Sequence, residues 1–394
     1  MNTKRTYWVG VFTAFVAGCF VAALLGKASA GLSLIIEELG LNLFEAGLII
    51  SLFSVIAATG GLVLGIFARR VGQLYGALLG LACAVGGGLF GAISESFLFL
   101  LLSRLIEGLG FILAAVSLPP LIQQVCRSQD QPIAMGLWGA FMPVGMGSVM
   151  LLAPLLLDQF GWRGTWNLIA AATLVWFGIT WLVFRNRIQQ TPASSAGAVP
   201  IRSILFDART VLMFLCFIGY SALFTPVGSL LPTLLVDQKQ LSVTLAAQLG
   251  AIVVVANIIG NFASGWLIKR GYSPAGLIQL AFVAMGLLGV VVFLDITSPG
   301  LKVLAGFLFS AIGGLIPGGL FVIIARISQA PGQVAILAGV LLQGAGFGQV
   351  FGPMAATAIA ESMARWDYVA VYILVSGVIG LYFSLRLGRV LGRY

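Results

Sequence analysis

The chain has 394 residues, of which 60% are hydrophobic and only 8% are charged. Soluble domains carry about 25% charged residues, so this composition excludes a soluble globular protein and predicts a polytopic membrane protein in a lipid bilayer. The formal net charge of +9 is better explained by loops that fix membrane topology than by a nucleic-acid partner. The absence of histidine and the isolated positions of the four cysteines indicate no metal site and no cofactor.

Apolar segments long enough to cross a bilayer recur along the whole chain. A transmembrane helix needs roughly 17–25 residues, and the longer segments indicate tilt or curvature. The predicted spans lie near 7–36, 45–67, 73–93, 97–124, 132–157 and 164–184, then near 209–236, 242–268, 275–294, 300–325, 333–359 and 367–387. We therefore predict an all-α membrane protein with twelve transmembrane helices.

One long polar connection, residues 185–208, is rich in Pro, Ala, Ser and Gly and is typical of a linker. It separates an N-terminal six-helix half, residues 1–184, from a C-terminal six-helix half, residues 209–394. The two halves contain a similar segment, a glycine followed at the end by two basic residues. It ends the second span at Gly65–Arg70 and the eighth span at Gly265–Arg270. A duplication of six spans indicates two pseudo-symmetric halves, as in one large transporter architecture.

Loop charges predict the orientation of the chain in the membrane. One set of loops holds fifteen basic residues against two acids, Asp130 and Asp207, and the other holds nine acids against four basic residues, Lys302 among them. Basic residues collect in cytoplasmic loops, so both termini and the linker are predicted to be cytoplasmic, in an inner or plasma membrane. Trp162 and Trp166 are expected at the outer interface, as part of an aromatic belt.

Three charged residues, Lys27, Arg104 and Glu107, fall inside predicted spans. Charge at membrane depth costs a few kcal/mol or more, so such groups usually face a protein interior or a wet cavity. Arg104 and Glu107 share one helical face at i, i+3, which predicts an ion pair. Lys27 either lines a positively charged cavity with Arg104 or snorkels to the outer headgroups. About 13 Å of helix separate it from the span end, which favours the cavity.

The roles of the charged pair remain open at this stage. Arg104 has five donors suited to a planar anion, but it could also serve only helix packing and neutralise Glu107. Glu107 could carry a coupled proton, although structural pairing with Arg104 is the favoured role. Further candidates for substrate contact are Phe111, Tyr220, Phe224, Asn257 and Gln343. The alternative for this set is packing, or hydrogen bonding between helices.

The chain resembles the major facilitator superfamily over nearly its whole length. That family's loop pattern G-x-L-x-D-R-x-G-R-[KR] is matched by Gly65, Arg70 and Gly72. Arg69 stands where the family has Asp, and Gln73 where it has a basic residue. The family's Asp helps to lock the cytoplasmic gate, so the departure at Arg69 puts that lock in doubt.

Later motifs extend the resemblance. The family pattern R-x-x-Q-G-x-G in the fourth span is matched at Arg104, Gly108 and Gly110, with Glu107 in place of Gln. The Gly/Pro pattern of the fifth span is matched loosely, at Gly139, Pro143, Gly145 and Gly147. Within the superfamily, the stretches 103–111, 136–143 and 161–166 look like the cyanate permease and nitroimidazole transporter branch.

The resemblance implies a secondary active transporter that moves a small molecule by alternating access between two halves. We expect a small organic or inorganic anion to be imported, with a possible coupled proton or other ion. The alternative is an exporter of amphipathic drugs or metabolites, by proton antiport. Enzyme activity is not expected, because the chain has no Walker A sequence or Ser/His/Asp set, and a monomer is expected. The residues assigned to gating are Gly65, Arg69, Arg70, Gly72, Pro143, Gly265, Lys269 and Arg270.

Overall fold

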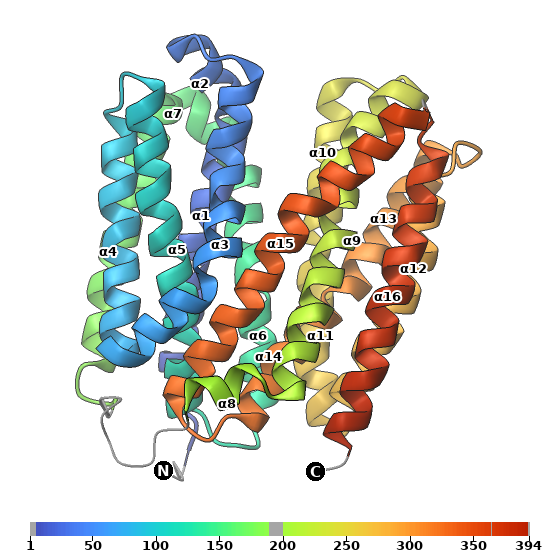
Figure 1. The fold of residues 1–394 in the computed structure, drawn as a ribbon. Helices are drawn as coiled ribbons and strands as arrows, with labels where there is room; N and C mark the ends of the chain where they lie inside the picture. The colour runs from blue at the N-terminus through green and yellow to red at the C-terminus, as the bar shows by residue number, and fades with distance from the viewer. Residues whose placement is uncertain (1–4, 189–199, 364, 393–394) are drawn as a thin grey trace.

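The computed structural model describes residues 5–188, 200–363 and 365–392. Regular structure within these ranges is entirely helical, without a strand. The helices form two groups that stand side by side (Figure 1). The all-α membrane fold with two six-helix halves is therefore confirmed.

Seven helices form the N-terminal half. They are α1 (Trp8–Ala30), α2 (Leu32–Leu39), α3 (Leu43–Val71), α4 (Gln73–Ala92), α5 (Phe97–Val125), α6 (Gln131–Gly139) and α7 (Phe141–Phe184). The short helix α8 (Ile201–Leu205) lies in the predicted linker, of which residues 189–199 are outside the described ranges. The domain boundaries predicted from the sequence stay a prediction.

The C-terminal half repeats the same kind of bundle. Its helices are α9 (Ala208–Lys239), α10 (Val243–Val255), α11 (Asn257–Lys269), α12 (Pro274–Phe293), α13 (Pro299–Gly313), α14 (Leu315–Ile327), α15 (Pro331–Met363) and α16 (Asp367–Leu391). Within each half the long helices pack against one another, for example α1 against α7 and α12 against α16.

Helix α7 is too long for one crossing. Its 44 residues would extend about 66 Å, twice the hydrocarbon thickness of a bilayer. The backbone leaves the helical region at Gly161, where φ is 61° and ψ is −177°, a conformation that glycine adopts without Cβ strain. Eleven helical stretches of the described chain are long and apolar enough to span a membrane, and division of α7 at Gly161 gives the twelve predicted crossings.

In three places a single non-helical residue separates two helices that belong to one span. The interruptions fall at Ala140, Ala256 and Gly314, which separate α6 from α7, α10 from α11 and α13 from α14. Pro143 and Pro317 each follow such an interruption by three residues. Both prolines therefore lie in the first turn of a helix, where the missing N–H sacrifices no intrahelical bond.

The halves meet where α15 packs against α3 and α5, and where α6 packs against α11 and α14. A Cβ added to Gly61 would come within 2.6 Å of the Gly339 carbonyl oxygen, and one added to Gly136 within 2.8 Å of the Gly265 Cα. The contact is therefore backbone against backbone, which only small residues permit.

Contact between the halves is confined to one part of the molecule. We call the end where α1 begins and α16 ends the terminal end; toward the opposite end, where α2 and α10 lie, the two groups of helices diverge (Figure 1). Ser54 Oγ of α3 donates to Gln349 Oε1 of α15 at 2.9 Å. Nearer the terminal end, Gln123 Nε2 donates to the Ala325 carbonyl oxygen at 3.1 Å. The structure therefore represents a state closed at the terminal end.

Candidate functional site

Glu107 holds two cations at once inside the N-terminal half. Its Oε1 accepts a hydrogen bond from Lys27 Nζ at 2.5 Å, and its Oε2 accepts one from Arg104 Nη1. The three side chains are 0–1% exposed. The predicted ion pair between Arg104 and Glu107 is thus present, and Lys27 joins it to make a buried charge triad.

The sequence of α4 makes room for the triad. Arg104 and Glu107 lie on one face of α5, and Lys27 lies on α1. A Cβ on Gly87 would come within 2.7 Å of Glu107 Cγ, and one on Gly88 within 3.4 Å of Lys27 Nζ. Because α4 presents glycines at this level, the charged side chains fit between helices of one half.

The two cations differ in how well they are satisfied. Arg104 also donates to the carbonyl oxygens of Leu24 at 3.0 Å and Ile49 at 3.3 Å, and its Cζ lies 4.1 Å from the ring centroid of Phe53. The Lys27 ammonium contacts Glu107, through its hydrogen bond, and the ring of Trp166, whose centroid lies 4.0 Å from Nζ. Both aromatic contacts are attractive cation–π interactions.

The position of Lys27 decides one of the alternatives left open by the sequence. Its ammonium points to Glu107 and not to headgroups, so the snorkelling alternative is wrong. The cavity expected around it is filled by neighbouring helices in this state, since the side chain is fully buried. A role of Lys27 in substrate binding stays a prediction.

The two tryptophans expected in an outer belt point inward instead. Trp162 is 2% exposed and Trp166 is fully buried. Trp162 Nε1 donates to Glu38 Oε2 at 2.5 Å, while Trp166 lies against Lys27. Position near a span end suggested the belt, but the sequence carried no signal for the side on which each ring lies.

Candidate residues of the C-terminal half form a neutral network. Asn257 Nδ2 donates to Tyr220 Oη and to the Ser310 carbonyl oxygen, both at 3.0 Å. Asn261 Nδ2 donates to Asn257 Oδ1 at 2.9 Å, and Phe224 stacks on Tyr220 with centroids 5.5 Å apart. We call Tyr220, Asn257, Asn261 and Ser310 the neutral network; it joins α9, α11 and α13.

Two further candidates lie elsewhere. Phe111 packs against Phe53 and Phe141, with centroids 5.8 and 6.3 Å apart, in the core of the N-terminal half. Gln343 Oε1 accepts a hydrogen bond from the Leu62 backbone N–H at 3.3 Å, across the contact between the halves. The predicted substrate residues thus occupy four separate places in this state: the triad, the aromatic core around Phe111, the neutral network and the α3–α15 crossing.

The gating residues of the N-terminal half lie at the terminal end. Gly65 lies against α15, where a Cβ would come within 2.8 Å of the Ala335 carbonyl oxygen. Arg69 lies beside the start of the same helix, because a Cβ on Gly332 would come within 3.0 Å of Arg69 Cγ. Arg70 is exposed, and Gly72 ends α3 with a positive φ of 96°.

The corresponding loop of the C-terminal half supplies a charge contact that the sequence did not reveal. Lys269 Nζ donates to Asp130 Oδ1 at 2.9 Å, across the halves, and Thr6 Oγ1 donates to Asp130 Oδ2 at 2.6 Å. Arg270 stacks on Trp266, with Cζ 3.5 Å from the ring centroid. Lys269 and Asp130 are far apart in the sequence, so no local spacing could have identified this pair.

Comparison with known proteins assigns the family. The Major Facilitator Superfamily profile matches residues 10–347. The chain belongs to the major facilitator superfamily. This membership, with the related transporters below, makes it a multi-pass secondary transporter of small molecules, and not an enzyme.

Individual relatives of this superfamily member are distant. A protein of Haemophilus influenzae named for metabolite transport is 27% identical over 312 residues, 73% of each chain. The hexuronate transporter of Bacillus subtilis is 24% identical over 245 residues, 59% of this chain and 57% of its own. The human organic anion transporter TETRAN shares the fold with a TM-score of 0.72 at 17% identity, over 96% of this chain and 98% of its own.

Proposed function

We propose that this superfamily member imports a small organic or inorganic anion by alternating access between its halves. The observation that carries the proposal is the buried charge triad, in which two cations share one carboxylate. An enclosed excess positive charge is costly in a low-dielectric interior, and a nearby anion offsets that cost.

The names of two similar proteins support the same class of substrate. A hexuronate is a carboxylate, and TETRAN is named as an organic anion transporter. The resemblance to the cyanate permease branch, which we keep as part of the proposal, also favours an anion.

We propose that the substrate binds near the midplane, between α1, α5, α9 and the α13–α14 pair. There it would lie between the triad and the neutral network, with Phe111, Phe224 and Gln343 as further contacts once the helices shift. Arg104 and Lys27 would attract the anion, and Glu107 would be the group available for a coupled proton. The transporter would act as a monomer.

Uptake of glucuronate into proteoliposomes tests the proposal, with glucose as the neutral control solute. Lys27→Gln removes the excess charge and leaves Arg104 on Glu107, so we expect glucuronate uptake per protein to fall strongly. Lys27→Arg should keep part of it, because charge survives but shape does not. Lys302→Gln is the matched control, since Lys302 is also fully buried but donates to the Val292 and Leu294 carbonyl oxygens of the other half.

Two results would count against an anion importer. The first is wild-type uptake of glucuronate that Lys27→Gln leaves unchanged. The second is efflux of amphipathic cations driven by a proton gradient, insensitive to Lys27, which would favour the exporter alternative.

We also propose that the terminal end faces the cytoplasm of an inner or plasma membrane, as the loop charges predict. Ser203 in α8 and Asp237 near the end of α9 are both exposed. In a background in which the native cysteines are replaced, Ser203→Cys should resist an impermeant maleimide in intact cells, and Asp237→Cys should react. The reverse labelling would invert the orientation.

A further inference from the structure

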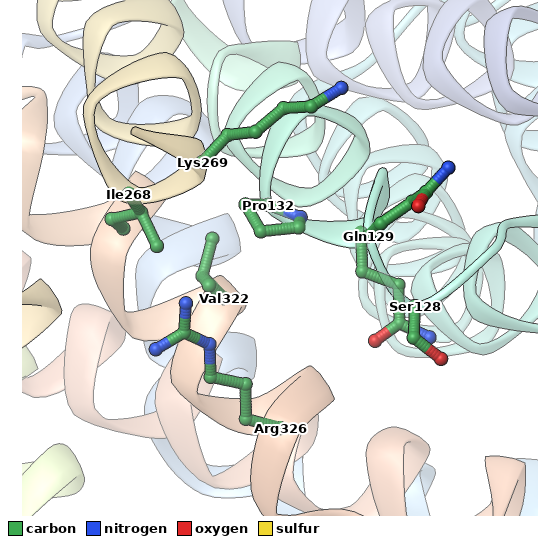
Figure 2. A pocket seen from close by; sticks show the side chains of 8 residues that line it. Ser128, Gln129, Pro132, Ile268, Lys269, Val322 and Arg326 are labelled. Carbon is green, nitrogen blue, oxygen red and sulfur yellow. The ribbon is translucent and has the colours of Figure 1, made fainter. Parts of the chain in front are cut away.

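A pocket of about 340 Å³ lies at the terminal end, between the two halves (Figure 2). The N-terminal half contributes Ser128 and Gln129, which connect α5 to α6, together with Gln131. The C-terminal half contributes Lys269 at the end of α11 and Arg326 in the last turn of α14. Its volume is at the lower end of the range for small-molecule sites.

The lining carries two positive charges and, among the described residues, no acidic side chain. Lys269 is paired with Asp130, and Figure 2 shows its side chain reaching along one edge of the pocket, away from Arg326. Asp130 uses both carboxylate oxygens on Thr6 and Lys269. No hydrogen bond or ion pair joins Arg326 to another described residue, so its five donors remain available.

Neutral donors stand opposite the arginine. Ser128 and Gln129 lie across the pocket from Arg326 in Figure 2, and Gln131 also belongs to the lining. A guanidinium on one side and several neutral donors on the other suit a ligand with several acceptor oxygens.

We propose that this pocket binds a compact oxyanion, either a free phosphate or the phosphate of a lipid headgroup. The lining comes from both halves, so the site is complete only while the terminal end is closed. The anion therefore stabilises the present state and slows opening of this end, by binding one conformation in preference to the other. The pocket shares no lining residue with the proposed substrate site, so this regulatory role does not depend on which substrate is carried.

Thermal unfolding of the purified full chain in an uncharged detergent tests the proposal. Inorganic phosphate is titrated against chloride at constant ionic strength, and we expect a saturable rise in the unfolding temperature. Arg326→Gln should raise the half-saturating phosphate concentration by roughly tenfold or more, the effect of losing hydrogen bonds to a charged group. The half-saturating concentration of Arg326→Lys should be intermediate, because lysine keeps the charge but lacks the paired N–H donors of the guanidinium.

Arg386→Gln is the matched control, since Arg386 is an exposed arginine of α16, stacked on Tyr382 outside the pocket. It should respond to phosphate as the wild type does. An equal response in Arg326→Gln, or no saturable response to phosphate or lipid in the wild type, would overturn the proposal.

The source of the anion is resolved in nanodiscs without added phosphate. Phosphatidylglycerol discs are compared with phosphatidylcholine discs for the wild type and Arg326→Gln. Stabilisation by phosphatidylglycerol that depends on Arg326 assigns the site to a lipid headgroup, whereas a response to free phosphate alone assigns it to a soluble anion.

Discussion

The two halves bury polar groups of different kinds in related spans. In the N-terminal half, Lys27 in the first span and Arg104 in the fourth meet on Glu107. In the C-terminal half, Tyr220 in the seventh span and Ser310 in the tenth meet on Asn257, and every member is neutral. A bundle of this fold can thus fill its interior with amides and hydroxyls, so its architecture does not require the charges of the first half. The difference favours a functional role for the triad.

The largest effect is expected when the shared carboxylate is removed. Glu107→Leu leaves Lys27 and Arg104 buried without a counter-charge, and one such loss typically costs about 3–5 kcal/mol. We expect poor folding, measured as yield and thermal unfolding in detergent. The double variant Arg104→Leu with Glu107→Leu should recover part of the loss. Effects that simply add would show that the pair is not coupled.

The matched change in the other half should cost less. Asn257→Leu leaves the Tyr220 hydroxyl and the Ser310 carbonyl without this partner, at a cost of about 1–3 kcal/mol. Thermal unfolding of Asn257→Leu beside Glu107→Leu compares the two interiors directly. A larger loss for Asn257→Leu would remove the distinction between the halves.

A smaller step isolates one bond of the neutral network. Tyr220→Phe deletes the hydroxyl that accepts from Asn257 Nδ2 and keeps the ring stacked between Phe217 and Phe224. We expect a loss of about 0.5–1.5 kcal/mol, because Asn257 retains its bond to Ser310. Phe224→Leu is the control, because it removes the ring stacking and keeps the hydrogen bond. The loss of stability caused by Asn257→Leu should be the same with and without Phe224→Leu.

The smallest effect is expected from the charge pair that joins the halves. The Thr6 hydroxyl and then the Lys269 ammonium hold the pKa of Asp130 below its usual value. A carboxyl whose pKa is lowered on folding contributes stability that is present above its unfolded pKa, about 3.9, and lost as pH falls through the folded value. Asp130→Asn should therefore reduce stability by about 1 kcal/mol or less at neutral pH. The deficit should begin to shrink as the pH falls below about 4 and should vanish below the lowered folded pKa of Asp130. A deficit that does not change with pH would show that the charge of Asp130 does not contribute.

Sequence reasoning predicted what depends on local pattern. The twelve spans follow from hydrophobic length, and the Arg104–Glu107 pair follows from helical spacing. Lys27 required knowledge of packing, because its partner is 80 residues away and the space for it is made by glycines of α4. The charge count places Lys302 among the loop charges, but its side chain is fully buried and caps the end of α12 through two carbonyl oxygens. Capping of this kind depends on how two helices meet, which composition does not reveal.

The glycine crossings between the halves have a mechanical consequence. At Gly61–Gly339 and Gly136–Gly265 the helices touch through bare backbone, so at these two points no side chain must change rotamer when the surfaces part. Interlocked side chains would add steric friction to that motion. Separation at the terminal end is opposed by loss of dispersion contacts, by a few hydrogen bonds, each worth about 1 kcal/mol, and by the Lys269–Asp130 ion pair. Close backbone contact of this kind suits a carrier that must separate and rejoin its halves in every turnover.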